Sequence, residues 1–166
     1  MKTNISALMS LIAEEEKNFS NKCYTIREYS LNTSIEELDG RVNIIEDNKE
    51  SFDSDLKELE RSNENLSRLK AILYEKNNSF KLSDGRSIQQ AIVDNSNLRK
   101  LKSCYENLLL AKNTKKRFTE VNNSYFECKT INFDPNELKT RLEEIDSSIQ
   151  QTDFEISKLN SIEFEI

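Results

Sequence analysis

Apolar side chains recur at alternating four- and three-residue steps in four stretches of the chain. Heptad spacing of this kind is typical of helices that pack against one another at a shallow angle. It predicts helices at about residues 4–29, 51–77, 88–121 and 135–160. The four apolar stripes are Ile5, Met9, Ile12, Phe19, Cys23 and Ile26; Phe52, Leu56, Leu59, Asn63, Leu66 and Leu73, widened by Leu69 and Ile72; Ile88, Ala91 or Ile92, Leu98, Leu101, Tyr105 and Leu108, continuing weakly to Phe118 and Val121; and Leu138, Leu142, Ile145, Ile149, Thr152, Ile156 and Leu159.

Two helix starts carry clear capping signals. Ser87 followed by Gln90 matches the capping box that opens many helices. The run Asp134-Pro135-Asn136-Glu137 combines an N-cap residue, a proline suited to the first helical position and an acidic residue facing the helix dipole. Asn63 allows two interpretations: a buried polar residue that fixes the register of a coiled coil, or a residue that faces water.

The segments between the helices lack the helical period. Residues 30–49 contain the turn signal Asp39-Gly40 and either a short strand or an extended connection over 41–45. Residues 79–87 contain a second turn signal, Asp84-Gly85. The stretch 124–133 is rich in aromatic and β-branched residues, as a strand would be, and we expect it to pair with residues 80–82. The tail SIEFEI either adds an edge strand or frays.

Together these elements predict an all-α fold in a single helical domain, residues 1–166. Long antiparallel helices would form a four-helix or coiled-coil bundle, with a small two-stranded β patch at one end. Long helices with narrow apolar stripes commonly pair across subunits as well, so we expect a symmetric homo-oligomer.

Composition excludes several kinds of catalytic site. The chain has no histidine, so a Cys/His zinc site, a histidine general base and a Ser-His-Asp triad are absent from within one chain. We therefore expect a protein that is not an enzyme and needs no cofactor. Three cysteines without metal-like spacing fit a reducing cytosol. The opening MKTNISALMSLIAEEEK is too short and too interrupted for a membrane span and weak as a signal peptide, so we expect a cytoplasmic protein without a membrane partner.

Charge is distributed unevenly along the chain, whose net charge is −6. Residues 81–129 hold ten Lys or Arg and five Asp or Glu, whereas the flanking parts are acidic. A basic middle between acidic flanks suggests a local anionic ligand rather than a surface for nucleic acid. The alternative is an ordinary charged, solvated helix face.

The turn at Asp84-Gly85 is the first candidate ligand site, because it precedes a helix N-terminus, where backbone N–H groups attract anions. Arg86 can add a bidentate contact to phosphate, and Tyr125 or Phe126 can stack on a base if the strand returns toward the turn. The alternative is a plain turn with a solvated Arg86 and with the aromatic rings in core packing. The candidate ligand-binding residues are Lys81, Ser83, Asp84, Arg86, Arg117, Tyr125, Phe126 and Lys129.

Two acidic clusters, Glu14-Glu15-Glu16 and the run 53–60, resemble carboxylate metal sites only superficially. Di-metal bundles of the ferritin type need Glu-x-x-His, which a chain without histidine lacks. An all-carboxylate Mg²⁺ site is conceivable, but solvated helix faces explain these runs better, and we expect no metal.

The block KLSDGRSIQQAIVDNSNLRKLKSCYENLL, preceded by ILYEKNNSF, resembles the septicolysin-like family of small helical bacterial proteins. The shared motif is the turn Leu82-Ser83-Asp84-Gly85-Arg86-Ser87-Ile88, placed between an Asn-rich helix end and a long helix. Similar small helical oligomers encoded by phages act as sponges that bind nucleotide immune signals without cleaving them. The resemblance implies such a role in phage anti-defence, in the host cytoplasm if the chain is phage-encoded.

Three functions follow as hypotheses. The first is a non-enzymatic oligomeric binding protein that sequesters a small phosphate-bearing nucleotide, such as cyclic ADP-ribose or a related molecule. The second is a structural coiled coil that binds protein partners and no small molecule. The third, cytolysis, is disfavoured because the chain lacks a strongly apolar segment.

Overall fold

The computed structural model describes residues 2–166 of the 166-residue chain and divides into two compact units. The first contains the residues up to Asn77 together with Asn160–Ile166, and the second contains Asn78–Leu159. The sequence suggested one helical domain over the same stretch.

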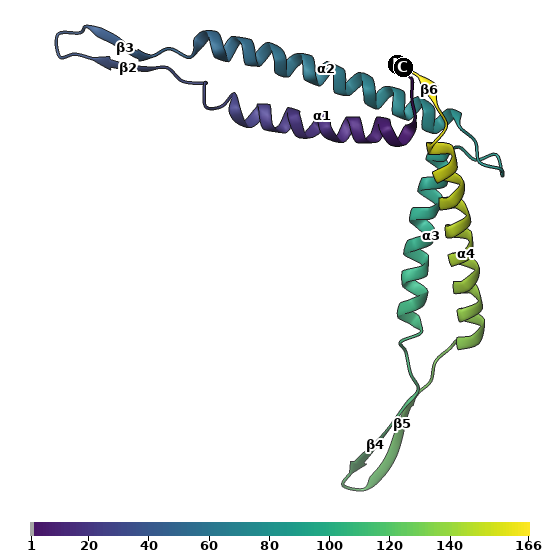
Figure 1. Ribbon diagram of the computed structural model, residues 1–166. Coiled ribbons are helices and arrows are strands. Elements are labelled where there is room, and N and C mark those ends of the chain that lie inside the picture. Colours follow the sequence, from purple (N-terminus) through teal and green to yellow (C-terminus); the bar gives the residue numbers. More distant parts are fainter. Residues whose placement is uncertain (1) are drawn as a thin grey trace. The chain divides into compact units, whose positions relative to one another are not determined.

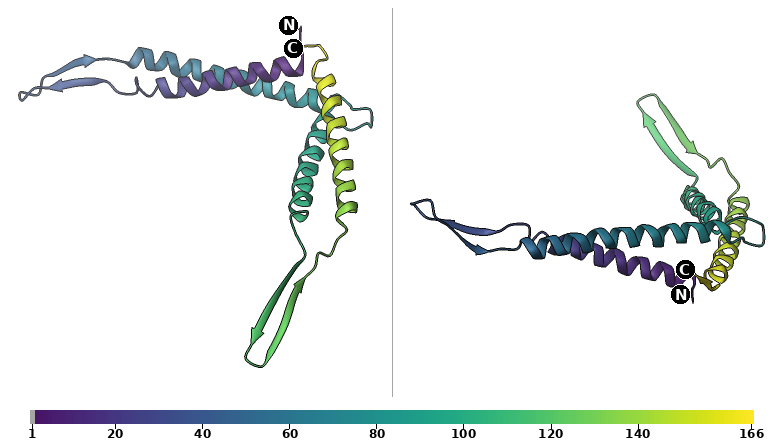
Figure 2. Two further views of the ribbon diagram at one scale, coloured as in Figure 1. Left: turned by 60° about the horizontal axis from the view of Figure 1, so that its bottom comes forward. Right: turned by 90° about the horizontal axis from the view of Figure 1, so that it is seen from above.

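The first unit is a helical hairpin with a β-hairpin at its far end (Figure 1). Helices α1 (Ile5–Thr25) and α2 (Lys49–Ser79) lie side by side, and strands β2 (Thr33–Glu36) and β3 (Val42–Glu46) extend beyond them, as all three ribbon views show (Figures 1 and 2). The short strands β1 (Lys2–Thr3) and β6 (Phe164–Glu165) pair antiparallel at the other end.

The core of the first unit is a single seam between α1 and α2. Leu8 and Ile12 meet Leu66 and Leu69, and Phe19 and Phe164 pack against this cluster. The predicted stripe was wrong at Met9, which is 51% exposed, while its neighbour Leu8 is fully buried. In an amphipathic helix, two adjacent rows of side chains can be almost equally apolar. A single partner helix buries only one of these rows. Asn63 is exposed, which decides between its two interpretations in favour of the one that faces water.

The second unit is another helical hairpin. Its helices α3 (Ile88–Leu108) and α4 (Pro135–Asn160) run antiparallel, and strands β4 (Thr114–Glu120) and β5 (Asn123–Lys129) form a hairpin between them in sequence (Figure 1). The Ser87 side chain accepts a hydrogen bond from the backbone N–H of Gln90 at 3.1 Å, which confirms the predicted cap. The predicted bounds of the final helix, 135–160, are also confirmed.

The seam of the second unit mixes apolar and polar side chains. Ile88 and Ala91 of α3 are buried, as are Leu138, Ile149 and Thr152 of α4, and all seven members of the predicted α4 stripe are buried or half-buried. Asn95 is also buried and donates to the carbonyl oxygen of Ile149 and to Asp153. Because each buried amide needs a specific partner, this contact helps to fix the register of the two helices.

The predicted fold class, all-α with one β patch, was wrong. The described chain contains four helices and three separate two-stranded sheets, so the fold is mixed. The helix expected at 88–121 ends at Leu108, and residues 114–120 form β4. The strand expected at 124–133 pairs with β4 across a two-residue turn and not with residues 80–82. Strand β5 pairs with β4, its neighbour in sequence, because closing a short loop costs less conformational entropy than closing a long one. Residues 30–49 contain a complete hairpin instead of one short strand.

None of the helices formed by residues 2–166 combines the length and the apolar content that crossing a bilayer requires.

The position of the seam predicts different losses of stability for substitutions at two neighbouring residues of α1. Leu8→Ala should lower the free energy of unfolding by about 2–4 kcal/mol, because it leaves a cavity in the buried cluster. Met9→Ala should cost less than about 1 kcal/mol, because its side chain is half-exposed. Urea unfolding followed by circular dichroism measures both. Equal losses at the two positions, or a larger loss at Met9, would contradict the observed seam.

Candidate functional site

The turn before α3 is held by hydrogen bonds within its own unit. Lys81 and Ser87 form an isolated antiparallel bridge, and the N–H of Gly85 donates to the carbonyl oxygen of Leu82 at 3.0 Å. Gly85 has φ 87°, a left-handed conformation that other residues adopt only with strain. The turn predicted at Asp84-Gly85 is therefore confirmed.

A carboxylate from α4 already occupies the anion-binding groups of this turn. The backbone N–H of Ser83 donates to Glu155 at 2.9 Å, and the Ser83 hydroxyl lies 2.8 Å from the same carboxylate. These contacts lower the pKa of Glu155, the backbone N–H of Ser83 having the largest effect, followed by the side chain of Gln151. A ligand phosphate would have to displace this internal anion.

Arg86 is likewise engaged by carboxylates of its own unit. Its guanidinium donates to Asp84 and to Asp94, both at 2.8 Å, and reaches the Thr152 hydroxyl at 3.4 Å. The hydrogen bonds from Arg86 lower the pKa of Asp84, while Asp84 and then Asp94 raise the pKa of Arg86. With two carboxylates around one guanidinium, the charge of Arg86 is compensated within the turn. Lys81, the other cation of the turn, is exposed and forms no ion pair within residues 2–166. The arrangement around Arg86 suits a structural link between the turn, α3 and α4.

The other candidate residues lie at the opposite end of α3. Arg117 belongs to β4, and Tyr125, Phe126 and Lys129 belong to β5. The 21 residues of α3 separate this hairpin from the turn by about 30 Å along the helix axis. The structure therefore does not bring the predicted residues into one pocket, because β5 pairs with β4 and does not return to the turn.

One face of the β4–β5 hairpin carries positive charge without a carboxylate. Directly opposed residues of an antiparallel pair share a face, and side chains alternate along each strand. Arg117 therefore shares a face with its partner Phe126, and Lys115 shares it with Cys128. We call this surface the cationic face; its members are Lys115, Arg117, Thr119, Ser124, Phe126 and Cys128. The Lys115 ammonium lies 4.5 Å from the centre of the Phe126 ring.

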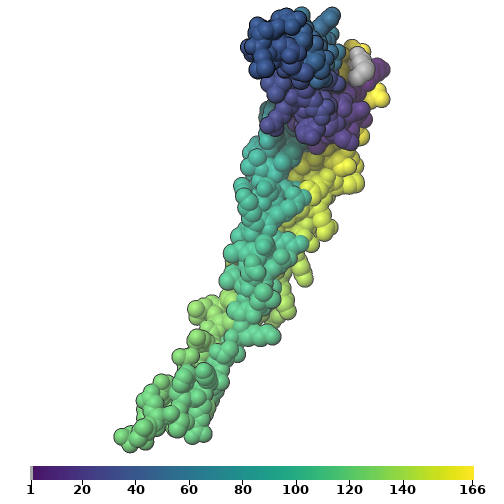
Figure 3. All heavy atoms as spheres, turned by 90° about the vertical axis from the view of Figure 1, so that its left-hand side faces the viewer, coloured from purple at the N-terminus to yellow at the C-terminus, as the bar shows by residue number. Residues whose placement is uncertain are grey.

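Arg117 is the residue of this face with the most available charge. It makes no ion pair with any residue in the described range 2–166. The hairpin lies beyond the ends of α3 and α4 in the space-filling view (Figure 3), and the Phe126 side chain is 56% exposed. Lys115 was not among the predicted ligand residues, because its contact with the Phe126 ring depends on the pairing of β4 with β5.

The opposite face of the same hairpin is electrically compensated. Phe118 and Tyr125 stack there with ring centres 5.5 Å apart. The Tyr125 hydroxyl lies 3.4 Å from Glu120, and Lys129 forms an ion pair with Glu127 at 3.8 Å. Tyr125 and Lys129, both predicted ligand residues, thus lie on a different face from Arg117 and Phe126.

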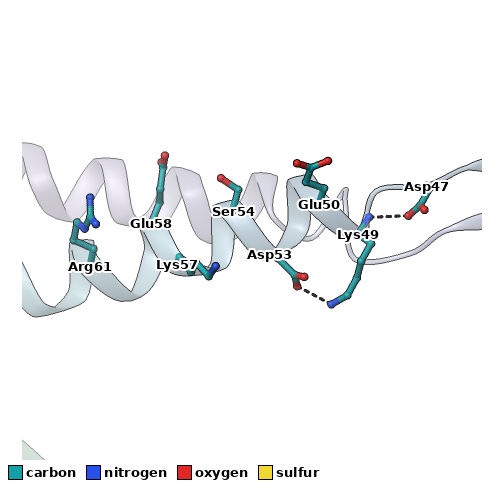
Figure 4. A pocket seen from close by; sticks show the side chains of 8 residues that line it. All are labelled: Asp47, Lys49, Glu50, Asp53, Ser54, Lys57, Glu58 and Arg61. Carbon is teal, nitrogen blue, oxygen red and sulfur yellow. Dashed lines mark hydrogen bonds and ion pairs between the residues drawn. The ribbon is translucent and has the colours of Figure 1, made fainter.

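A hollow of about 780 Å³ in the first unit is an open shelf along α2. Its lining mixes four carboxylates with three cations, and Lys49 pairs with Asp53 at 2.7 Å (Figure 4). The shelf therefore has no excess positive charge to hold a phosphate. The residues that line it are Asp47, Lys49, Glu50, Asp53, Ser54, Lys57, Glu58 and Arg61.

Within residues 2–166, no three Cys, Asp or Glu side chains gather in a way that could hold a metal ion.

Comparison with known proteins places most of the chain in one family model. Residues 29–160, from before β2 to the end of α4, match the model of a family of unknown function (DUF6847). No curated protein and no solved structure matches the chain.

The contact between Ser83 and Glu155 predicts a pH dependence. Because the pKa of Glu155 in the fold lies below its ordinary value of 4.5, the ionised carboxylate stabilises the fold. This contribution is complete above about pH 4.5 and is lost as the pH falls through the lowered pKa. Carboxyl NMR titration should show a rise in the Glu155 pKa in Ser83→Ala, which loses the hydroxyl donor. Ser148→Ala, at an exposed position of α4, should leave it unchanged. An unshifted Glu155 pKa in the unmodified chain would contradict the contact.

Proposed function

The chain belongs to the DUF6847 family, whose function is unknown, and we propose that this member is a non-enzymatic binding protein that acts as a homo-oligomer. Its ligand is a phosphate-bearing nucleotide derivative, held on the cationic face of the β4–β5 hairpin. The observation that carries this proposal is the exposed, unpaired Arg117 beside Phe126 and Lys115, on a face without a carboxylate.

These three side chains suit the two parts of a nucleotide. A guanidinium matches two oxygens of a phosphate with parallel hydrogen bonds, and an ammonium adds a mobile point charge. An exposed phenyl ring offers a stacking surface to any base, worth about 1–3 kcal/mol per base. Lys115, which rests over the ring in the free chain, would move from the ring to the phosphate as the base stacks.

The biological role in this proposal is sequestration. A protein that binds a nucleotide immune signal, such as cyclic ADP-ribose, without cleaving it lowers the free concentration of that signal in the cytoplasm. The lack of histidine supports binding over acid–base catalysis. The resemblance to septicolysin-like proteins and a phage origin remain predictions.

A structural, protein-binding role without a small ligand is the second candidate. It is favoured by the turn before α3, where Ser83 and Arg86 are engaged by Glu155, Asp84 and Asp94. The one motif that most resembled a phosphate site in the sequence therefore serves the packing of the helices. Under this candidate, the cationic face binds no nucleotide.

Calorimetry with cyclic ADP-ribose isomers and cyclic dinucleotides tests the proposal. Arg117→Ala should weaken binding about tenfold or more, because it removes a charged hydrogen bond worth about 1.5–3 kcal/mol. Lys115→Ala should also weaken it. Lys116→Ala is the matched control, since it removes the same charge from the same strand but from the opposite face.

Two outcomes would count against this function. One is the absence of heat with every one of these compounds at protein concentrations well above micromolar. The other is an equal loss of affinity in Lys116→Ala and Lys115→Ala, which would show a response to net charge alone.

A further inference from the structure

The β4–β5 hairpin exposes two unpaired strand edges. It contains only two strands, and among the described residues neither strand pairs with a third. Isolated two-stranded ribbons are marginally stable in water, and free edges are templates for pairing with another chain. Pairing with a further strand would therefore stabilise the hairpin.

The register fixes which backbone groups of β5 are free. Glu120 and Asn123 close a two-residue turn, so they form a hydrogen-bonded pair. Such pairs alternate with non-hydrogen-bonded pairs along an antiparallel ladder. The backbone groups of Ser124, Phe126 and Cys128 consequently point away from β4, along the free edge of β5.

The two edges differ sharply in charge. Strand β4 carries three consecutive cations, Lys115, Lys116 and Arg117, and charged residues of this kind protect an edge from pairing. Strand β5 carries one acid and one base among seven residues, Glu127 and Lys129. Charge repulsion therefore disfavours pairing between two copies along the β4 edge, whereas it does not oppose pairing along the β5 edge.

We propose that β5 of one copy pairs antiparallel with β5 of a second copy, in a register centred on Phe126. Both Phe126 rings then face each other, Ser124 lies opposite Cys128 of the second copy, Tyr125 opposite Glu127, and Asn123 opposite Lys129. No like charges oppose each other, and the outward backbone groups of both strands are satisfied. The result is a four-stranded sheet with twofold symmetry, a closed arrangement common in homodimers.

The exposed area of the chain supports a second copy as the occupant. The chain exposes 12546 Å². Two separate compact domains, each of half its 19.4 kDa, would together expose about 10,000 Å². The excess of more than about 2,000 Å² exceeds the roughly 800 Å² that each partner buries in a standard interface.

Pairing at β5 also completes the proposed ligand surface, and this step rests on the function proposed above. The two cationic faces become one, with the two Phe126 rings at the centre. Neighbouring strands lie about 4.8 Å apart, so the two Arg117 strands lie about 14 Å apart, on either side of the rings. The surface then suits a nucleotide derivative with two phosphates separated by its base.

A cysteine placed at Ser124 tests the register. Directly opposed residues of a hydrogen-bonded pair have Cα atoms about 5.5 Å apart, which suits a disulfide. Within one chain, residues 124 and 128 lie about 13 Å apart along the strand, so they cannot bridge. The test chain carries Ser124→Cys together with Cys23→Ser and Cys104→Ser, and retains Cys128. Mild oxidation should convert most of it to a dimer on a non-reducing gel, with peptides 124 and 128 linked in mass spectra.

The matched control is Asn123→Cys in the same background, because residue 123 projects from the other face of the strand. Its dimer yield should be at least about fivefold lower at the same protein concentration. Circular dichroism of both variants checks that each is folded. A monomer in both cases, or equal yields in both, would overturn the proposal.

The strand-pairing proposal and the nucleotide proposal can fail separately. A 124–128 link without calorimetric heat for any nucleotide would retain the β5 pairing and reject the ligand. Heat that depends on Arg117, with no 124–128 link, would retain the ligand and reject the pairing.

Discussion

A seam between two helices can bury only one stripe of each helix, and this limit determines the rest of the structure. In the first unit, Leu8 and Leu69 are almost fully buried, whereas Met9, one position away, is half-exposed. In the second, the seam includes Asn95, whose amide nitrogen donates to α4 while its buried side-chain oxygen has no partner among the described residues. It also includes Thr152, whose hydroxyl lies 3.4 Å from the guanidinium of Arg86. Units this thin keep many apolar side chains at the surface.

The same limit explains the chemistry of the turn before α3. A thin seam needs polar contacts at its end, and Glu155 supplies one by accepting from the N–H and hydroxyl of Ser83. Arg86 joins Asp84, Asp94 and Thr152 in the same way. Groups that could bind a phosphate therefore stabilise the helix pair, whereas Lys115, Lys116 and Arg117 of the β4–β5 hairpin form no ion pair within residues 2–166.

The parts of the fold that were predictable from sequence depend on local contacts. The cap at Ser87, the turn at Gly85 and the start of α4 at Pro135 each involve neighbours within a few residues. The predicted stripe of α1 was right at Ile5 and Ile12, which are buried, and wrong at Met9, because a heptad pattern does not reveal which of two adjacent apolar positions meets the partner helix. The predicted partner of β5 was also wrong, because residues 114–120 were expected to continue a helix and the neighbouring strand β4 was not recognised.

The candidate site was predictable only in part for the same reason. Arg117, Tyr125, Phe126 and Lys129 do lie in one hairpin, but the alternation of side chains places them on two different faces. Lys115 could be recognised only once residues 114–120 were seen to be a strand, because only then does it come to rest over the ring of Phe126.

Hydrogen exchange of the β5 backbone tests most directly whether this hairpin is completed by a second copy. The measurement is the exchange rate of the amides of Ser124, Phe126 and Cys128, followed by NMR at low and high protein concentration. Pairing at β5 predicts that all three exchange slowly in concentrated protein and much faster on dilution, while Tyr125 and Glu127, bonded to β4, change less. Fast exchange of the three amides at every concentration would contradict the account.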